Sequence, residues 1–294
     1  MTNVVVTGAD GQVGSLIRAK ANAYPFKIFA LNREALDITS PQSILDAIDK
    51  YKPCLIINCA AYTAVEQAEK NKRQALQVND YAVQLLGKAC LEADIPLFHI
   101  STDYVFDGAK HEPYNEEDEA FPQNSYGASK LAGEKSLQQI LERHLIIRTS
   151  WVFSEIGNNF VKTMLRLSAQ NNRIKVVSDQ ISAPTSAHSL AEILLTLAHK
   201  FIQEGELKWG VYHYANYPYC SWFDFAKEIF NQATKKNLIA VEPTVEPVSS
   251  EQFASLVKRP QFSRLDCGKI DNCISGCLRD WRIELSNVLD ATSE

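Results

Sequence analysis

The sequence predicts an α/β protein in which a doubly wound parallel sheet is joined to a smaller C-terminal part. Largely apolar runs at residues 4–6, 54–57 and 96–100 are typical of strands that a parallel sheet buries on both faces. A segment with helical periodicity, residues 73–92, lies between two of these runs. A glycine-rich turn, residues 7–14, follows the first run directly, as in the strand–turn–helix units of such sheets.

Composition narrows the class of protein further. Hydrophobic residues at 46% and charged residues at 22% are typical of a globular protein, and no apolar run is long enough to span a bilayer. The net charge of −5 and the lack of a basic stripe argue against a nucleic-acid partner. Because Met1 leads into a strand without a secretory leader, we expect a cytoplasmic protein with no membrane partner. The 7 cysteines fit no common zinc-ligand spacing, so we expect free thiols and no metal site.

Three glycines in the first turn have the spacing of a dinucleotide-binding turn. Gly8 lets the chain turn, Gly11 lets the backbone approach a diphosphate, and Gly14 lets the next helix pack on the strand. The amides near Gln12 and Val13 lie at the start of that helix and favour an anion. Since the motif follows an N-terminal strand, it predicts a Rossmann-type sheet with a dinucleotide cofactor.

The end of the second predicted strand, residues 26–31, bears on the choice of cofactor. A free ribose 2′-hydroxyl prefers a carboxylate at this position, whereas the chain has Asn32 and Arg33 there. We therefore expect NADPH, with NADH also accepted, while an ordinary surface arginine remains the alternative interpretation of Arg33. Asp37 and Ile38 follow and are expected to line the adenine pocket.

The third predicted strand and the helix after it raise two further expectations. Small residues at the end of the run 54–61 leave room for a ligand. Helical periodicity over residues 73–92 places Leu76 near the same face as Val83, Leu86 and Cys90. On this spacing the simplest interpretation of Asn79 is an amide that faces solvent.

Acid/base chemistry is predicted near the end of the fourth strand. Tyr126 and Lys130 are four residues apart, so on a helix their side chains lie on one face. A tyrosine hydroxyl titrates near ~10, and a neighbouring ammonium stabilises its anion and makes it a better proton donor. Thr102 stands at the carboxyl end of a predicted strand, where such sheets bind ligands. A Tyr/Lys pair alone could be a chance pair on a solvated helix face. Together with the glycine-rich turn and the hydroxyl at the strand end, it predicts a reductase that uses a nicotinamide cofactor.

The remaining segments suggest how the chain divides. Residues 107–123 are rich in charge, proline and glycine, so we expect an exposed flap, with Asn124 or Ser125 capping the helix that follows. We expect residues 1–150 to form the dinucleotide-binding domain. Residues 151–294 should form mainly the substrate-binding part, interleaved with the first. The strand expected at 210–215 need not belong to the first sheet.

These motifs resemble those of the extended short-chain dehydrogenase/reductases. Within that family, the chain is similar to the branch that reduces dTDP-4-dehydro-L-rhamnose, and the resemblance runs essentially end to end. Its motifs include Gly11-Gln12-Val13-Gly14, Ser101-Thr102-Asp103-Tyr104, Tyr126-Gly127-Ala128-Ser129-Lys130, Arg148-Thr149-Ser150-Trp151, Gly157-Asn158-Asn159-Phe160 and Arg259-Pro260.

The resemblance implies a role for each matching residue. Tyr126 would donate a proton, Lys130 would be its electrostatic partner and a ligand of the cofactor ribose, and Thr102 would orient the sugar carbonyl. Asn79 would be the structural asparagine of the wider family. The residues expected along the dinucleotide are Gly8, Gly11, Gln12, Val13, Gly14, Asn32, Arg33, Asp37, Ile38, Ala60, Ala61, Tyr62, Thr63, Tyr126 and Lys130. The residues expected at the sugar nucleotide are Thr102, Asp103, Tyr104, Trp151, Asn159 and Arg259, the last because a buried diphosphate needs a cation.

The resemblance also bears on metal and oligomeric state. Some family members are dimers held partly through a bound Mg²⁺, and they carry a Glu in the first helix. Leu16 stands at that position here, so the sequence does not support an Mg²⁺ bridge. Both a monomer and a homodimer stay open.

The activity implied is hydride transfer from NADPH or NADH to the C4 keto group of dTDP-4-dehydro-L-rhamnose, yielding dTDP-L-rhamnose for surface polysaccharide such as O antigen. One alternative is a sugar-nucleotide dehydratase or epimerase on the same fold. Dehydratases carry Thr-Asp-Glu where this chain has Thr102-Asp103-Tyr104, so the extra acid for eliminating water is missing. A second alternative is a regulatory subunit of methionine adenosyltransferase, which keeps the same motifs without turnover.

Overall fold

The computed structural model describes residues 2–253 and 255–292. Its centre is a six-stranded sheet in which all neighbouring strands run parallel, in the order β10, β5, β4, β3, β1, β2. The strand order reverses at β1, which has β2 on one side and β3 on the other; in such sheets ligands bind outside the carboxyl ends of the strands near this point. The strands are β1 (Asn3–Thr7), β2 (Lys27–Leu31), β3 (Leu55–Asn58), β4 (Leu97–Thr102), β5 (His144–Thr149) and β10 (Gly210–His213).

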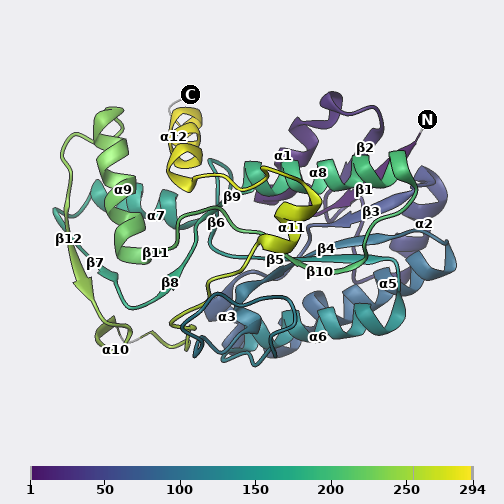
Figure 1. The fold of residues 1–294 in the computed structure, drawn as a ribbon, viewed down its shortest axis with the longest axis horizontal. Coiled ribbons are helices and arrows are strands. Elements are labelled where there is room, and N and C mark those ends of the chain that lie inside the picture. Colours follow the sequence, from purple (N-terminus) through teal and green to yellow (C-terminus); the bar gives the residue numbers. More distant parts are fainter. Residues whose placement is uncertain (1, 254, 293–294) are drawn as a thin grey trace.

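Helices cover both faces of this sheet, so the predicted doubly wound architecture is confirmed (Figure 1). Helices α1 (Gln12–Ala19) and α8 (Ala187–Glu204) pack together on one face. Helices α2 (Pro41–Tyr51), α5 (Ala82–Glu92) and α6 (Ser125–Ile140) lie on the other. Successive residues of β1 alternate between the two cores: Val4 and Val6 face α8, and Val5 faces α2. This explains why the strands appear in the sequence as continuous apolar runs.

A second, smaller core lies beside the sheet, at the left of Figure 1. The parallel pair β7 (Arg173–Val177) and β12 (Thr244–Val248) packs there with α7 (Phe160–Ser168), α9 (Trp222–Lys235) and α12 (Trp281–Thr292). Strand β10, although late in the chain, pairs with β5 at the edge of the large sheet. The short elements are η1 (Ala21–Ala23), α3 (Val65–Lys70), α4 (Lys72–Leu76), η2 (Gln77–Tyr81), η3 (Asp103–Val105), β6 (Val152–Phe153), β8 (Ile181–Ser182), β9 (Thr185–Ser186), β11 (Cys220–Ser221), α10 (Ser250–Phe253) and α11 (Gly268–Cys273).

The helical segment at residues 72–92 contains a π turn at Gln77–Tyr81, and this corrects two expectations. A π turn takes up about one extra residue, which rotates the preceding side chains by roughly 100°. Leu76 is therefore 44% exposed instead of facing the core with Val83. Asn79 is buried, and its side chain donates to Ser129 Oγ and to Tyr62 O. The simplest sequence interpretation of Asn79 was wrong, and the structural role implied by the family agrees with these contacts.

The segment 107–123, expected as an exposed flap, is anchored at its middle. Tyr114 is buried and stacks on Phe106, with the ring centroids 4.1 Å apart. The Tyr114 amide donates to Arg264 O, and Glu116 accepts from the His213 amide. These partners lie about a hundred residues or more further along the chain, so local composition did not reveal them.

Helix α6 is fixed at its start and at its middle. Asn124 caps it by accepting a hydrogen bond from the Gly127 amide at 2.8 Å, as predicted. Deeper in, Glu134 receives three hydrogen bonds of 2.7–3.1 Å from the Arg148 guanidinium of β5, and both residues are buried. The Arg148 guanidinium also lies 5.1 Å from the centre of the Phe106 ring. The pair holds the helix that carries Tyr126 and Lys130 against the sheet.

Replacing Glu134 should be strongly destabilising, because it leaves the Arg148 guanidinium buried without its carboxylate. We expect Glu134→Ala to lower the free energy of unfolding by about 3–5 kcal/mol, measured by urea denaturation. Glu92→Ala, at the exposed end of α5, is the matched control and should stay within about 0.5 kcal/mol of wild type. Equal effects for the two variants would contradict this role of the pair.

Candidate active site

A cleft of about 530 Å³ opens at the carboxyl ends of β1, β3, β4 and β5. Its walls come from the turn before α1, the segments after β3 and β4, the start of α6, and residues beyond Thr149. The predicted site residues that line it are Gly11, Gln12, Val13, Ala61, Thr63, Thr102, Asp103, Tyr104, Tyr126, Lys130, Trp151 and Asn159. The fold thus brings together residues from both halves of the sequence.

The predicted glycines allow close backbone packing in the turn beside the cleft. Gly8 has φ +68°, and a Cβ on it would lie 2.7 Å from the Ala60 amide nitrogen. A Cβ on Gly14 would lie 2.2 Å from Gly8 O, so the first turn of α1 packs directly on the turn before it. Gly11 lines the cleft and is the N-cap of α1, where no side chain occupies the free amides. These amides are available to an anion.

The residues predicted for cofactor choice lie after the edge strand β2 and do not line this cleft. Asn32 accepts a hydrogen bond from the Ala35 amide, which shapes the turn. Arg33 is largely exposed and lies 3.8 Å from Asp37. Hydrogen bonds from Thr39 hold the pKa of Asp37 below its usual value. Ile38 is buried in the core.

Tyr126 and Lys130 both line the cleft. Burial raises the pKa of Tyr126 to about 12, while a hydrogen bond with Thr102 acts in the opposite direction. Burial lowers the pKa of Lys130 to about 8, against the attraction of Glu134. The Lys130 ammonium donates to Ile100 O at 2.7 Å. The cleft therefore contains a tyrosine whose pKa is raised and a lysine whose pKa is lowered.

Asp103 also lines the cleft and contacts a segment late in the chain. Ser263 Oγ donates to Asp103 Oδ2 at 2.6 Å, and Thr102 Oγ1 donates to Oδ1 at 3.2 Å. Burial raises the pKa of Asp103 to about 7 despite these hydrogen bonds. A carboxyl group that titrates near neutral pH thus stands next to the predicted carbonyl-orienting hydroxyl.

Two stacked tryptophans close the opposite side. Trp151 has a positive φ of 46°, which is costly for a bulky side chain. Its ring stacks on Trp222 with centroids 3.6 Å apart and an interplanar angle of 13°. Trp222 lines the cleft from the first turn of α9, and nothing in its local sequence separates it from an ordinary core aromatic. Sequence reasoning did not include it, nor did it include Val152 and Leu190, which also line the cleft.

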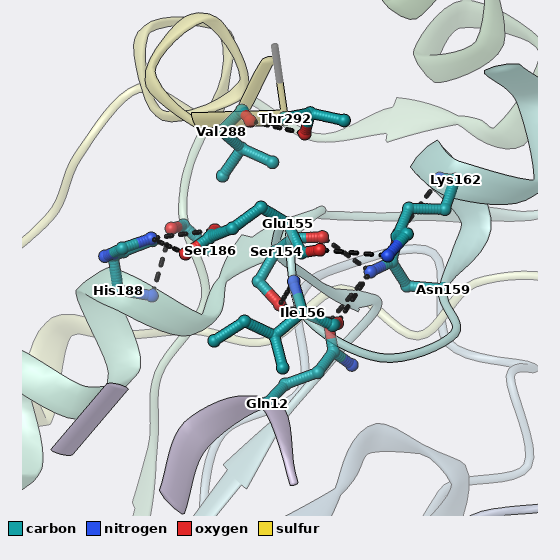
Figure 2. Close-up of polar contacts among 10 residues, drawn as sticks. All are labelled: Gln12, Ser154, Glu155, Ile156, Asn159, Lys162, Ser186, His188, Val288 and Thr292. Carbon is teal, nitrogen blue, oxygen red and sulfur yellow. Dashed lines mark hydrogen bonds and ion pairs between the residues drawn. The ribbon is translucent and has the colours of Figure 1, made fainter. Parts of the chain in front are cut away.

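Gln12 connects the glycine turn to residues 154–159 (Figure 2). Its side-chain oxygen accepts hydrogen bonds from Ser154 Oγ at 2.8 Å and from Asn159 Nδ2 at 3.0 Å. Asn159 also caps α7 by accepting from the Lys162 amide. Because two donors fix the Gln12 oxygen, its amide nitrogen is left for a ligand in the cleft.

Other predicted residues have structural partners outside the cleft lining. Arg259 forms an ion pair with Glu66, and its charge lowers the pKa of the neighbouring Tyr104, whose burial raises it. Tyr62 binds Asn79 through its backbone amide and carbonyl. Leu16 is buried in the core under α1.

Neither a metal cluster nor a membrane span is found in the part of the chain that the structure describes. Residues 2–253 and 255–292 contain no group of three or more His, Cys, Asp or Glu side chains suited to a metal ion. Within the same residues, no helix has the length and apolar character needed to cross a bilayer. All 7 cysteines are free thiols.

The parallel sheet, the glycine turn and the tyrosine–lysine pair in the cleft define a dinucleotide-dependent enzyme of the short-chain dehydrogenase/reductase class. Residues 1–294 match the family model described as RmlD substrate binding domain, and the chain belongs to this family. It is 40% identical to the dTDP-4-dehydrorhamnose reductase of Aggregatibacter actinomycetemcomitans over 98% of both chains. It is 34% identical to the enzyme of that name from Escherichia coli, over 98% of this chain and 97% of the other.

Solved structures agree with this assignment. The dTDP-4-dehydrorhamnose reductase of Bacillus anthracis, solved in complex with NADP, superposes with a TM-score of 0.91 at 35% identity. That comparison covers 99% of this chain and 100% of the other. The corresponding protein from Clostridium acetobutylicum gives a TM-score of 0.90 at 34% identity, with both chains fully covered.

Proposed function

We propose that this protein reduces the C4 keto group of dTDP-4-dehydro-L-rhamnose with a hydride from NADPH, yielding dTDP-L-rhamnose. The observation that carries the proposal is the convergence of Tyr126, Lys130 and Thr102 in one cleft with the glycine turn. The names of the relatives supply the sugar nucleotide. The product would serve surface polysaccharide such as O antigen, and the reaction would take place in the cytoplasm.

The residues present fit a dinucleotide cofactor. The turn around Gly8 and Gly14 is so tight that a Cβ on either residue would meet backbone atoms, and the free amides after Gly11 suit a diphosphate. When bound, NADPH supplies the hydride. Gln12 and Val13 would lie along the diphosphate, and Ala60, Ala61, Tyr62 and Thr63 along the next stretch of the cofactor. NADPH is the expected cofactor and NADH would also be accepted; Leu16, in place of the Glu of some family members, does not support an Mg²⁺ bridge.

Tyr126 would give its proton to the carbonyl oxygen as that oxygen gains negative charge. The Oη–H bond of the tyrosine breaks, an O–H bond forms on the sugar, and the tyrosinate left behind is stabilised by Lys130. Thr102 would donate a hydrogen bond to the same carbonyl oxygen and hold it within reach of Tyr126. Asp103, Tyr104, Trp151, Asn159 and Arg259 would contact the rest of the sugar nucleotide.

The two cores suggest which part of the chain binds the cofactor and which binds the sugar nucleotide. We assign cofactor binding mainly to residues 1–150 and sugar-nucleotide binding mainly to residues 151–294. Two elements of the second range belong to the first layer structure: β10 is the edge strand of the large sheet, and α8 packs on one of its faces. Either a monomer or a homodimer is compatible with this cleft, because residues of one chain form its walls.

The direct test is NADPH consumption by the purified protein in the presence of dTDP-4-dehydro-L-rhamnose. Turnover that requires the keto sugar supports the reductase. Cofactor binding without sugar-dependent oxidation would favour the regulatory-subunit alternative. Release of water from a dTDP-sugar would favour a dehydratase, which Tyr104 disfavours because no second acid stands beside Asp103 at that position.

Gly11→Val should abolish dinucleotide binding in a protein that still folds. The valine side chain would extend into the cleft and keep the diphosphate away from the backbone. Titration with NADPH, followed by fluorescence, measures the effect. Gly11→Ala is the milder control, because it shares the Cβ, which would lie 3.3 Å from Gly8 O, but lacks the two methyl groups that valine carries beyond it. Unchanged affinity in a folded Gly11→Val variant would refute this placement of the cofactor.

The end of β2 should control the choice between cofactors. Wild type is expected to bind NADPH at least as well as NADH, and Asn32→Asp should shift the preference to NADH by repelling the 2′-phosphate. The ratio of kcat/KM values for the two cofactors is the measurement. A wild type that strongly prefers NADH would show that the argument from Asn32 and Arg33 is wrong.

Tyr126→Phe should separate binding from chemistry. The variant keeps the ring and should bind NADPH nearly normally, while turnover falls by about 10²-fold or more. Thr102→Val should mainly lower turnover, whereas Lys130→Met should impair both binding and turnover. A Tyr126→Phe variant with wild-type turnover, its identity confirmed by mass, would rule out Tyr126 as the proton donor.

The wild-type pH profile should show a loss of turnover on the alkaline side. Lys130 carries its charge below its pKa of about 8 and loses that charge as the pH rises through this value, so the tyrosinate is no longer stabilised. The residual activity of Tyr126→Phe should lack this limb. An identical limb in both proteins would contradict its assignment to the Tyr126–Lys130 pair.

A further inference from the structure

A row of buried polar side chains crosses the sheet behind Lys130. Thr7, Asn58 and His99 occupy paired register positions on β1, β3 and β4. All three are buried, with at most 1% of each residue exposed. Two residues earlier on the same strands, the paired positions carry apolar side chains that face the core under α5. Three polar side chains thus end a face of the sheet that is otherwise apolar. The proposed reaction, as described above, assigns them no role.

Hydrogen bonds link this row to the catalytic lysine. Thr7 Oγ1 donates to Asn58 Oδ1 at 2.6 Å, and Asn58 Nδ2 lies 2.9 Å from His99 Nδ1. The other ring nitrogen of His99, Nε2, lies 3.2 Å from Lys130 Nζ. The chain of contacts thus runs from the first strand of the sheet to the group that stabilises the tyrosinate.

The donor and acceptor of each hydrogen bond in this row can be assigned by starting from the Ala60 amide, which contacts Asn58. The Ala60 amide can only donate, and it lies 3.2 Å from Asn58 Oδ1, which identifies that atom as the acceptor. Asn58 must then present its NH₂ group to His99, so His99 Nδ1 accepts. A neutral imidazole that accepts at Nδ1 carries its proton on Nε2. The His99 N–H consequently points at Lys130 Nζ.

An N–H group that points at an ammonium opposes its charge, whereas a neutral amine can accept that hydrogen bond. The other groups around Lys130 are Glu134 and Tyr126 of α6 and the Cys59 thiol after β3. Glu134 favours the ammonium, but its carboxylate is shared with Arg148. Cys59 has a pKa raised by burial to about 12, so the thiol is neutral at physiological pH.

We propose that His99, oriented by Thr7 and Asn58, is a positioning residue that weakens the hold of Lys130 on its proton. This inference rests on the proposed reductase function and deepens it. After each turnover the tyrosinate at Tyr126 must regain a proton. Lys130 can supply it: an Nζ–H bond breaks, the Tyr126 Oη–H bond forms, and the neutral amine accepts the His99 N–H until solvent returns a proton to Lys130.

The first test needs no enzymatic activity and so stands apart from the proposed function. NMR of the wild-type protein labelled with ¹⁵N-histidine, with the His99 signals assigned by comparison with His99→Gln, reports which ring nitrogen is protonated. We expect a neutral ring protonated at Nε2. A ring protonated at Nδ1 instead, or a charged imidazolium at neutral pH, would overturn the proposal even if the protein is an active reductase.

The second test asks whether the orientation of His99 affects Lys130. Asn58→Asp places an acceptor opposite His99 Nδ1, which moves the proton to Nδ1 and lets Nε2 accept from the ammonium. The alkaline limb of turnover should move up by about one pH unit, since an ordinary hydrogen bond changes proton affinity about tenfold.

The added carboxylate could also act on Lys130 through space, and a double-mutant cycle separates the two effects. Asn58→Asp should move the limb much less in a His99→Leu background than in the wild-type background. Equal shifts in both backgrounds, or no shift in either, would overturn the proposal. If these variants do not fold, the His99 tautomer measured in the wild-type protein still tests the proposal.

Discussion

Lys130 places a positive charge where water scarcely reaches, and the rest of the site depends on how the fold supports it. Burying an ammonium is expensive unless it has close polar partners. Here the partners are Ile100 O and, one helical turn away, Glu134. Ile100 lies in β4 and Glu134 in α6, so the two elements that meet at Lys130 both supply it with a polar partner.

Close packing of α6 makes this support geometrically possible. A Cβ on Gly127 would lie 2.1 Å from Tyr104 O, and a Cβ on Gly133 would lie 2.0 Å from Asn79 O. The two glycines let α6 approach the segment after β4 on one side and the π turn on the other. The same approach brings Lys130 to the end of β4 and Tyr126 beside Thr102. The geometry of the proposed site is therefore a consequence of helix packing as much as of Tyr126, Lys130 and Thr102 themselves.

Hydrogen bonds between segments far apart in the sequence complete the cleft. Asp103 of the large sheet binds Ser263, and Gln12 of the glycine turn binds Ser154 and Asn159. These links join the wall assigned to the cofactor to the wall assigned to the sugar nucleotide. Through them, a residue in the first turn of the chain could affect a sugar nucleotide that, in the proposed function, binds mainly to residues 151–294.

Sequence reasoning succeeded where the physics is local and failed where partners are distant. Apolar runs predicted the parallel strands, glycine spacing predicted the turn, and the four-residue spacing placed Tyr126 and Lys130 on one helix face. Periodicity could not reveal the π turn, which moved Leu76 outward and Asn79 inward, because it assumes a regular helix. Trp222 and the Tyr114 anchor were invisible because residues far along the chain create their environments.

In the proposed reaction, hydride passes from NADPH to the carbonyl carbon of a dTDP-linked keto sugar bound in this cleft. This transfer can be tested with NADPH that carries deuterium at the transferable position of its nicotinamide ring. After reaction with dTDP-4-dehydro-L-rhamnose, NMR and mass spectrometry of the product should show one deuterium, bound to C4. A product without deuterium, or with deuterium at another ring carbon, would contradict the account.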